Sequence, residues 1–160
     1  MKNYILALAS FLFLSQSFAT VWTVTDETDT IGCEYCLRSI IEDSISSFDT
    51  VNFSLPIPTT ITLTRGGIGH MSEVVIQGPG SGQVKITTAF ASAALITNSD
   101  AVYMEVYGLE FFNCGGPTDG GAVLCDGGTL KLDSCNFHDN NAQGAGGAAA
   151  CIWNGNLDVI

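Results

Sequence analysis

Short apolar runs, some of which alternate with polar residues as Val84 and Ile86 do, recur between turn residues after residue 70. Val74–Ile76, Ala94–Ile96 and Val102–Val106 each stop two residues before a glycine or an asparagine. Strict alternation is typical of strands with one buried face, and glycine and asparagine mark turns. The pattern therefore predicts strands of about three to five residues, at or below the usual strand length.

The segment after Cys36 follows a different period. Leu37, Ile40, Ile41 and Ile45 fall at positions i, i+3, i+4 and i+8, which places them on one face of a helix with charged residues opposite. We expect one short amphipathic helix here, between a first strand near Val21–Thr25 and the later strands.

The second half of the chain repeats itself with a period of 26 residues. A shift of that length superposes, without a gap, Met104 on Leu130, Phe111 on Phe137, Gly120-Gly121-Ala122 on Gly146-Gly147-Ala148 and Cys125 on Cys151. A third copy starts at Asn156, after one extra residue near Trp153. Such a period with short strands is the signature of a solenoid, whose coils bury their interior only by stacking.

The predicted fold is all-β: a right-handed parallel β-helix, or pectin-lyase-like solenoid, with a short N-terminal capping helix and an incomplete C-terminal end. A leucine-rich repeat is the alternative solenoid of this period, but its leucine pattern is absent. In a β-helix, Leu130, Leu132, Phe137 and Ala148 point inward, and Cys125 lies beside Cys151 in the next coil. We favour stacked thiols there; a disulfide is the alternative.

The first residues have the build of a secretory signal peptide. Lys2 precedes an uncharged apolar run, Ile5–Leu14, and the small residues Ser17 and Ala19 come before Thr20. An N-terminal membrane anchor is the alternative. We divide the chain into a signal peptide at 1–19, an N-terminal cap at 20–70 and β-helix coils at 71–160, with no transmembrane span in the mature segment.

Charge excludes one class of partner. The 160 residues include 5 Lys and Arg against 16 Asp and Glu, a net charge of −11, which offers no basic surface for nucleic acid. An exported chain meets an oxidising compartment, yet Cys33 and Cys36 are the only CxxC pair. We expect a structural role or a local disulfide for this pair rather than zinc or redox chemistry.

Two family resemblances cover most of the mature chain. The run Cys36-Leu37-Arg38, followed by Asp49-Thr50-Val51-Asn52-Phe53 and Ile61-Thr62-Leu63, resembles the bacterial CSLREA domain, an entry cap to a right-handed β-helix. Cys36 stands where that family has serine, Tyr35 stands where it has cysteine, and Ser39 replaces its glutamate. Leu37, Arg38, Asp49, Thr50 and Phe53 agree with the motif.

The second half resembles the repeats of chlamydial polymorphic outer membrane proteins, whose marks are G-G-A-I and F-x-x-N. The Gly-Gly-Ala runs at 120–122 and 146–148 match the first mark, and Phe137 with Asn140 matches the second, whereas Asn113 comes one place early. The resemblance implies an autotransporter passenger at the cell surface, in the outer membrane or outside the cell. It further implies adhesion to host or neighbouring cell-surface proteins or glycans.

Catalysis is the competing interpretation, because β-helices also resemble polysaccharide lyases and glycoside hydrolases. Such chemistry needs exterior carboxylates, and the nearest candidates are Asp133, His138 and Asp139. One coil earlier the equivalent residues are Tyr107, Phe112 and Asn113, so no acidic ladder forms; the available cations are Arg38, Arg65, Lys85 and Lys131. We expect no catalysis in this segment, the alternative being an enzyme whose site lies beyond residue 160.

No cofactor or metal is expected either. The calcium-binding nonapeptide pattern is absent, since Asp133 lies too far from Gly127 and Gly128. We expect Asn113, Asn140 and Asn141 to be corner residues with unusual backbone angles that bind local backbone groups, and His138 to be exposed.

Overall fold

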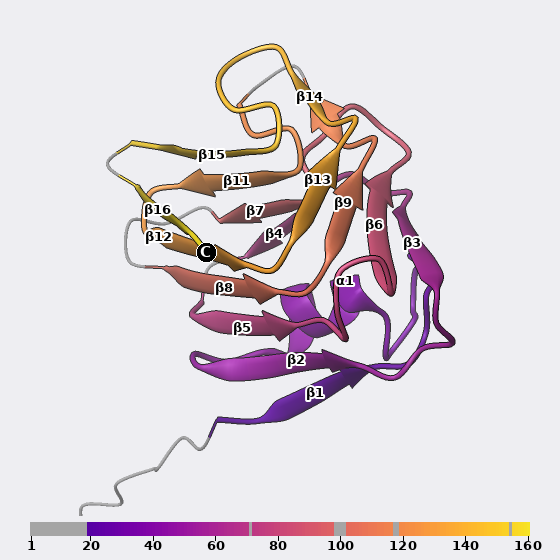
Figure 1. Ribbon diagram of the computed structural model, residues 1–160. Coiled ribbons are helices and arrows are strands. Elements are labelled where there is room, and N and C mark those ends of the chain that lie inside the picture. The colour runs from indigo at the N-terminus through magenta and orange to yellow at the C-terminus, as the bar shows by residue number, and fades with distance from the viewer. Residues whose placement is uncertain (1–18, 71, 98–101, 117–118, 154) are drawn as a thin grey trace, which may run out of the picture.

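The protein is a right-handed parallel β-solenoid in the computed structural model, which describes residues 19–70, 72–97, 102–116, 119–153 and 155–160. Each coil contributes strands to three parallel sheets that enclose one apolar core (Figure 1). The predicted fold class is therefore confirmed. No helix of the described residues is long and apolar enough to cross a membrane.

Three sheets form the walls. Sheet 1 runs in the order β1 (Val21–Val24), β2 (Asp49–Phe53), β5 (Val74–Gln77), β8 (Tyr103–Tyr107), β12 (Thr129–Asp133), β16 (Asn156–Val159). Sheet 2 contains β3 (Thr59–Leu63), β6 (Val84–Thr88), β9 (Glu110–Phe112) and β13 (Asn136–His138). Sheet 3 contains β4 (Ile68–His70), β7 (Leu95–Thr97), β11 (Val123–Asp126) and β15 (Ala149–Ile152). A small outer pair joins β10 (Gly115–Gly116) to β14 (Asn141–Ala142).

The strand register confirms the period seen in the sequence. Tyr103 lies opposite Thr129, so β8 and β12 are 26 residues apart, and the same offset joins β9 to β13, β10 to β14 and β11 to β15. Thr129 lies opposite Asn156, 27 residues later, which confirms the one extra residue near Trp153. Between earlier coils the offset varies, since Asp49 lies opposite Val74 and Val74 opposite Met104.

The corners repeat with the same period. Left-handed backbone recurs one coil apart at Gly108 and Ser134, Asn113 and Asp139, Gly120 and Gly146, and Gly127 and Trp153. The first Gly-Gly-Ala run combines three requirements. Gly120 has a φ of +67°, a Cβ on Gly121 would come within 1.7 Å of the Gly147 carbonyl oxygen, and Ala122 is fully buried. Only this order of small residues lets the next coil stack so closely.

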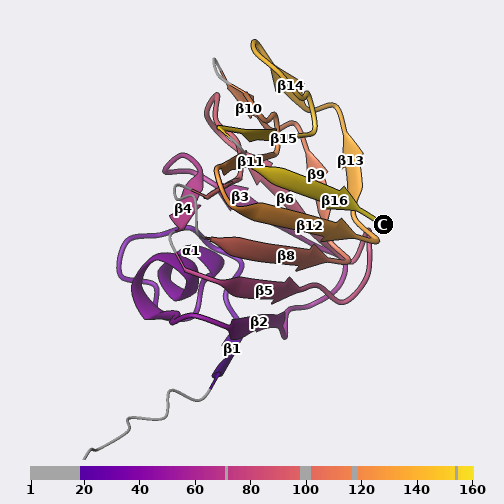
Figure 2. The ribbon, with the colours of Figure 1, turned by 90° about the vertical axis from the view of Figure 1, so that its left-hand side faces the viewer.

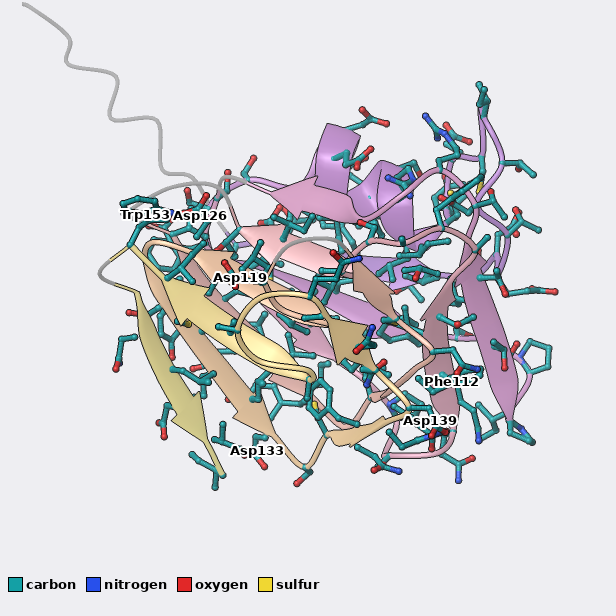
Figure 3. The ribbon with its side chains drawn as sticks, turned by 90° about the horizontal axis from the view of Figure 1, so that it is seen from above. Phe112, Asp119, Asp126, Asp133, Asp139 and Trp153 are labelled. Atoms are coloured by element: carbon teal, nitrogen blue, oxygen red, sulfur yellow. The ribbon has the colours of Figure 1, made fainter. Side chains whose placement is uncertain are left out.

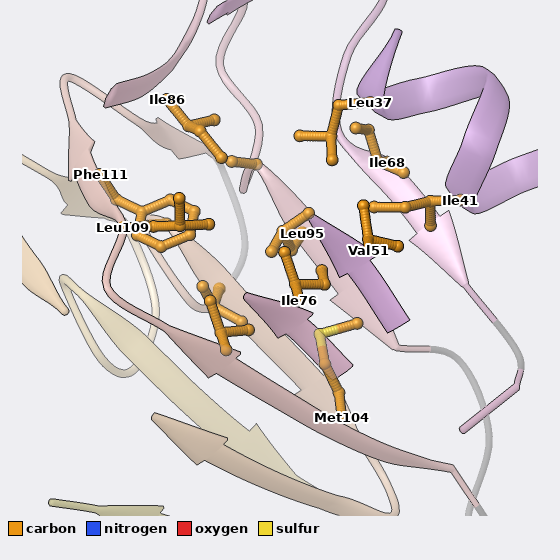
Figure 4. Packing of buried hydrophobic residues seen from close by; sticks show 14 of the residues in the cluster. Leu37, Ile41, Val51, Ile68, Ile76, Ile86, Leu95, Met104, Leu109 and Phe111 are labelled. Carbon is orange, nitrogen blue, oxygen red and sulfur yellow. The ribbon is translucent and has the colours of Figure 1, made fainter. Parts of the chain in front are cut away.

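The core is a set of ladders of like residues on successive coils (Figure 4). Val51, Ile76, Val106 and Leu132 lie opposite one another along sheet 1, and all are buried. Along sheet 2 the rings of Phe111 and Phe137 stack with centroids 5.2 Å apart. Phe137 and Ala148 are only half-buried, because in the described residues the last coil has a neighbour on one side only.

The predicted helix is present, but it is short and its second part is wound more widely than a regular α-helix. A single α-helical turn, α1 (Leu37–Ser39), continues as a π-helical turn, η1 (Ile40–Ser44), closed by the Ile45 N–H, which donates to the Ile40 carbonyl. Leu37, Ile40 and Ile41 are buried, and η1 packs against β4 at the N-terminal end (Figure 2). The apolar face predicted from the sequence therefore lies on the core.

Arg38 is a structural residue at this end of the solenoid. Its guanidinium binds both carboxylate oxygens of Asp29, at 2.6 and 3.1 Å, and donates to the carbonyls of Gly66 and Gly67. Asp29 also accepts from the Thr64 and Arg65 N–H groups. The pair thus ties the loop before the helix to the corner between β3 and β4.

Removal of one member of this ion pair should strongly destabilise the protein. Arg38 and Asp29 are 5% and 4% exposed, so Arg38→Met leaves a buried carboxylate without its cation, at a cost of about 3–5 kcal/mol. Burial raises the pKa of Asp29, but the bonds from Arg38 and Thr64 outweigh it and hold that pKa below its ordinary value. The stabilisation from the Asp29 carboxylate is therefore full above its unfolded-state pKa and is lost as the pH falls through the lower folded-state pKa. Urea unfolding from pH 7 to pH 2 measures both effects; equal stability of Arg38→Met and wild type would contradict this role.

Phe111 should contribute more to stability than any exposed phenylalanine. It is fully buried, so Phe111→Ala is expected to cost about 3–5 kcal/mol. Phe137→Ala should cost less, since that ring is half-buried, and Phe48→Ala, at a residue that is 66% exposed, should cost almost nothing. Denaturant midpoints of the three variants test the order, and a Phe111→Ala midpoint equal to that of Phe48→Ala would disprove it.

Candidate functional site

A cavity of about 320 Å³ lies where three strands of sheet 2 end. Thr88 is the last residue of β6, and the segments that follow β9 and β13 supply the other walls and include the outer pair of β10 and β14. Figure 2 shows this pair projecting past the stacked sheets. The lining residues are Thr88, Phe90, Ala91, Asn113, Cys114, Gly115, Gly116, Asp139, Asn141 and Gln143.

The lining combines one apolar ring with planar polar groups. Phe90 is 62% exposed although it is a large apolar residue. Asn113, Asn141 and Gln143 carry amides, which both donate and accept hydrogen bonds, and Asp139 adds an acceptor. Because glycines form part of the wall, side chains do not fill the space. We call this cavity the sheet 2 pocket.

Asn140 holds the pocket wall to the preceding coil. Its Oδ1 accepts from the Cys114 N–H and its Nδ2 donates to the Phe111 carbonyl, both at 2.9 Å. One coil earlier, Cys114 stands at this position, and its Sγ lies 3.7 Å from the Ile86 carbonyl oxygen. The side chain of the F-x-x-N asparagine is thus a bridge between coils.

This bridge corrects one expectation and supports another. Asn140 does not have a left-handed backbone, and its bonds reach a residue 26 positions away instead of local groups. The left-handed residue is its neighbour Asp139, with a φ of 58°. Asn113, which comes one place early in the sequence motif, has a φ of 50° and occupies the equivalent corner as expected. The positions of the asparagines in the sequence do not distinguish a corner residue, such as Asn113, from a residue that bridges two coils, such as Asn140.

A chain of charged groups leads away from the pocket along the outer face of sheet 2. Lys85 Nζ lies 2.8 Å from Glu110 Oε1, His138 Nε2 lies 3.2 Å from the same oxygen, and His138 Nδ1 lies 2.9 Å from Asp139 Oδ2. The imidazole also stacks on the ring of Phe112, which lies near Asp139 in Figure 3. Asp139 therefore belongs to both the pocket and this charged chain.

The contacts in this chain of charged groups favour the charged forms of Glu110 and His138. The bond from Lys85 lowers the pKa of Glu110, burial opposes it, and His138 lowers it further. Asp139, and then Glu110, raise the pKa of His138 above 6.5. Glu110 is only 5% exposed, and the 26-residue period of the sequence does not place a cation beside it. Its cation, Lys85, lies opposite it at an offset of 25.

Of the three candidates for catalysis, His138 and Asp139 come together, but Asp133 lies apart from them. Asp133 ends β12 of sheet 1 opposite Tyr107, its Oδ1 accepts from the Ser134 hydroxyl, and Figure 3 shows it apart from Asp139. Lys131 on the same sheet lies 3.4 Å from Glu105 and 3.0 Å from the Tyr107 hydroxyl. Such cross-strand pairs stabilise neighbouring coils.

All six cysteines are free thiols. Cys125 lies opposite Cys151 in adjacent strands, and the Cys36 Sγ lies 3.6 Å from the Cys33 carbonyl oxygen. Burial, then the neighbouring thiol, raises the pKa of Cys33 to about 11 and that of Cys151 to about 12, so both are weak nucleophiles. No cluster of three or more metal-ligating side chains occurs within the described ranges.

Comparison with protein-family models, curated proteins and solved structures finds no match to this chain. The resemblances to the CSLREA domain and to the polymorphic outer membrane proteins therefore stay predictions.

His138 should titrate above its ordinary pKa. A group with a raised folded-state pKa contributes stability below its unfolded-state pKa of about 6.5 and loses that contribution as the pH rises through the folded-state value. Proton NMR of the imidazole should show the raised midpoint. Asp139→Asn and Glu110→Gln should each lower it, whereas Asp133→Asn should not. A midpoint in wild type at or below the value in urea would contradict the contacts.

Proposed function

We propose that this chain belongs to an exported β-helical protein, displayed at the cell surface or secreted, that binds saccharides of a host or neighbouring cell surface through the sheet 2 pocket. The observation that carries the proposal is the pocket lining, in which an exposed aromatic ring faces the same cavity as three amides and a carboxylate. A sugar ring has an apolar C–H face and a rim of hydroxyls that donate and accept, so it fits both kinds of group.

The charge of the protein narrows the class of saccharide. A net charge of −11 and the Asp139 carboxylate in the pocket wall repel sialylated or sulfated chains. Neutral oligosaccharides, or those with free amino groups, are the ligands that this surface favours. The cavity volume, near the lower end for small-molecule sites, suits a short terminal unit better than a long groove-bound chain.

The ion pairs formed by two glutamates on the coils favour binding over catalysis. Glu105 and Glu110 are each held by a lysine, and the pKa of each lies below its ordinary value. A general acid needs a raised pKa, so neither is suited to protonate a leaving oxygen.

Export is supported by the sequence of 1–19, of which only Ala19 lies within the described residues. The solenoid begins immediately afterwards, with β1 at Val21. The stacked sheets present outward-facing side chains at regular spacing, which suits repeated contact with a cell surface.

Phe90→Ala should weaken saccharide binding about tenfold, the effect of losing a ring contact of about 1.4 kcal/mol. Titration calorimetry of the chain from Thr20 onward against a panel of neutral, amino and sialylated oligosaccharides measures it. Phe48→Ala is the matched control, since Phe48 is equally exposed and does not line the pocket.

Two results would overturn the proposal. One is equal affinity of Phe90→Ala and wild type; the other is the absence of binding to any neutral or amino sugar. The appearance of new reducing ends in the same mixtures would instead support the alternative function, that of a polysaccharide-cleaving enzyme.

A further inference from the structure

Asp49 carries a buried carboxylate at the first strand pair of the solenoid. It is 2% exposed, and its Oδ1 accepts from the Thr20 N–H at 2.6 Å. Its Oδ2 accepts from Trp22 Nε1 at 3.0 Å and from the Ser46 N–H at 2.8 Å. Every donor to this carboxylate that the structure describes is a neutral N–H group, in contrast to the lysine and arginine partners of Glu110 and Asp29.

Thr20 is held at this place by a second bond. Its carbonyl accepts from the Thr50 N–H at 2.9 Å, which makes Thr20 the first residue of the ladder between β1 and β2. Thr20 and Ala19 are both exposed, although the Asp49 side chain is not. The peptide bond between Ala19 and Thr20 is therefore at the surface, while the nitrogen of that bond faces a buried carboxylate.

The same nitrogen is the one that removal of the expected signal peptide would free. We propose that cleavage between Ala19 and Thr20 creates an α-ammonium group that forms an ion pair with Asp49, so that export processing locks the first strand onto the solenoid. This inference rests on the export proposed above. It assigns to Asp49, the aspartate of the D-T-V-N-F run, the role of an N-terminal clamp.

The step is an ordinary peptide hydrolysis by a signal peptidase. Water adds across the C–N bond between Ala19 and Thr20, its hydroxyl goes to the Ala19 carbonyl carbon, and its proton goes to the Thr20 nitrogen. Ala19 leaves as a carboxylate, and the proton released from its acid completes the Thr20 ammonium. No other reactant is needed.

The clamp changes the strength of one bond and leaves its geometry in place. Before cleavage, a neutral amide N–H donates to the Asp49 carboxylate; afterwards, an ammonium does so, and the bond gains the Coulomb attraction between two opposite charges. A buried anion also gains a countercharge, which matters most where water is excluded. Because β1 is an edge strand of sheet 1, with β2 as its one partner among the described residues, its attachment gains from the added ion pair.

The test compares chains that differ in what the Thr20 nitrogen carries. One chain is released from a fusion partner immediately before Thr20, a second keeps Ala19, and a third starts at Thr20 but is Nα-acetylated. At pH 7 and low salt, the folding equilibrium constant of the first should exceed those of the other two by at least tenfold. The acetylated chain keeps its N–H donor, so its deficit isolates the charge.

Asp49→Asn in the first two chains completes the cycle. The advantage of starting at Thr20 should disappear in that background, whereas Glu27→Gln, at an exposed carboxylate of the same N-terminal region, should leave it unchanged. If Asp49→Asn does not fold, the comparison of free and acetylated Thr20 with Asp49 intact decides the question alone.

N-terminal sequencing of the protein exported by its own cell separates the clamp from the export on which it rests. A mature chain that starts at Thr20 but gains no stability over its acetylated form overturns the clamp and leaves export standing. A mature N-terminus at any other residue overturns the processing step and the clamp together.

Discussion

Hydrogen bonding between the backbones of successive coils is the interaction on which the rest of this structure depends. Nearly all strand pairs in the described residues join one coil to the next, and these pairs are parallel. The backbone N–H and C=O groups of the strands therefore form their hydrogen bonds with neighbouring coils. Parallel pairing at a fixed offset then requires that the corners of each coil lie over those of the coil before. Left-handed backbone at equivalent positions, and glycine where the next coil approaches most closely, follow from that requirement.

The same constraint decides where chemistry is possible. Inward positions are filled mainly by stacked apolar side chains, so the charged groups of the stacked coils lie mainly on the outer faces and at the corners. On the outer faces, vertical neighbours neutralise each other, as Lys85 does Glu110 and Lys131 does Glu105. At the corner that follows sheet 2, the chain leaves the common path to form the outer pair of β10 and β14, and it is there that a cavity opens. The corner after sheet 2, rather than the stacked strands themselves, thus forms the candidate binding site.

Buried charged side chains lie at the N-terminal end of the solenoid. Arg38 binds Asp29, 9 residues away, and Asp49 binds Thr20, 29 residues away, and both pairs lie at the N-terminal end of the solenoid. In the CSLREA-like motif, then, the arginine and the aspartate have separable structural tasks. Arg38 binds Asp29 in the loop before the helix, and Asp49 binds the N–H group of Thr20 immediately before the first strand.

Residue order by itself determined the short strands, the helix with its apolar face, the 26-residue offset and the single extra residue before Asn156, because each depends on spacing along one chain. It did not reveal Glu110 or the bridging role of Asn140, since both depend on which residues of different coils lie side by side, and the offset between coils is 25 at Lys85 and 26 at Cys114. The pocket and the bond from Thr20 to Asp49 were likewise decided only by the tertiary structure. Both join residues that stacking, not sequence distance, brings within reach of each other.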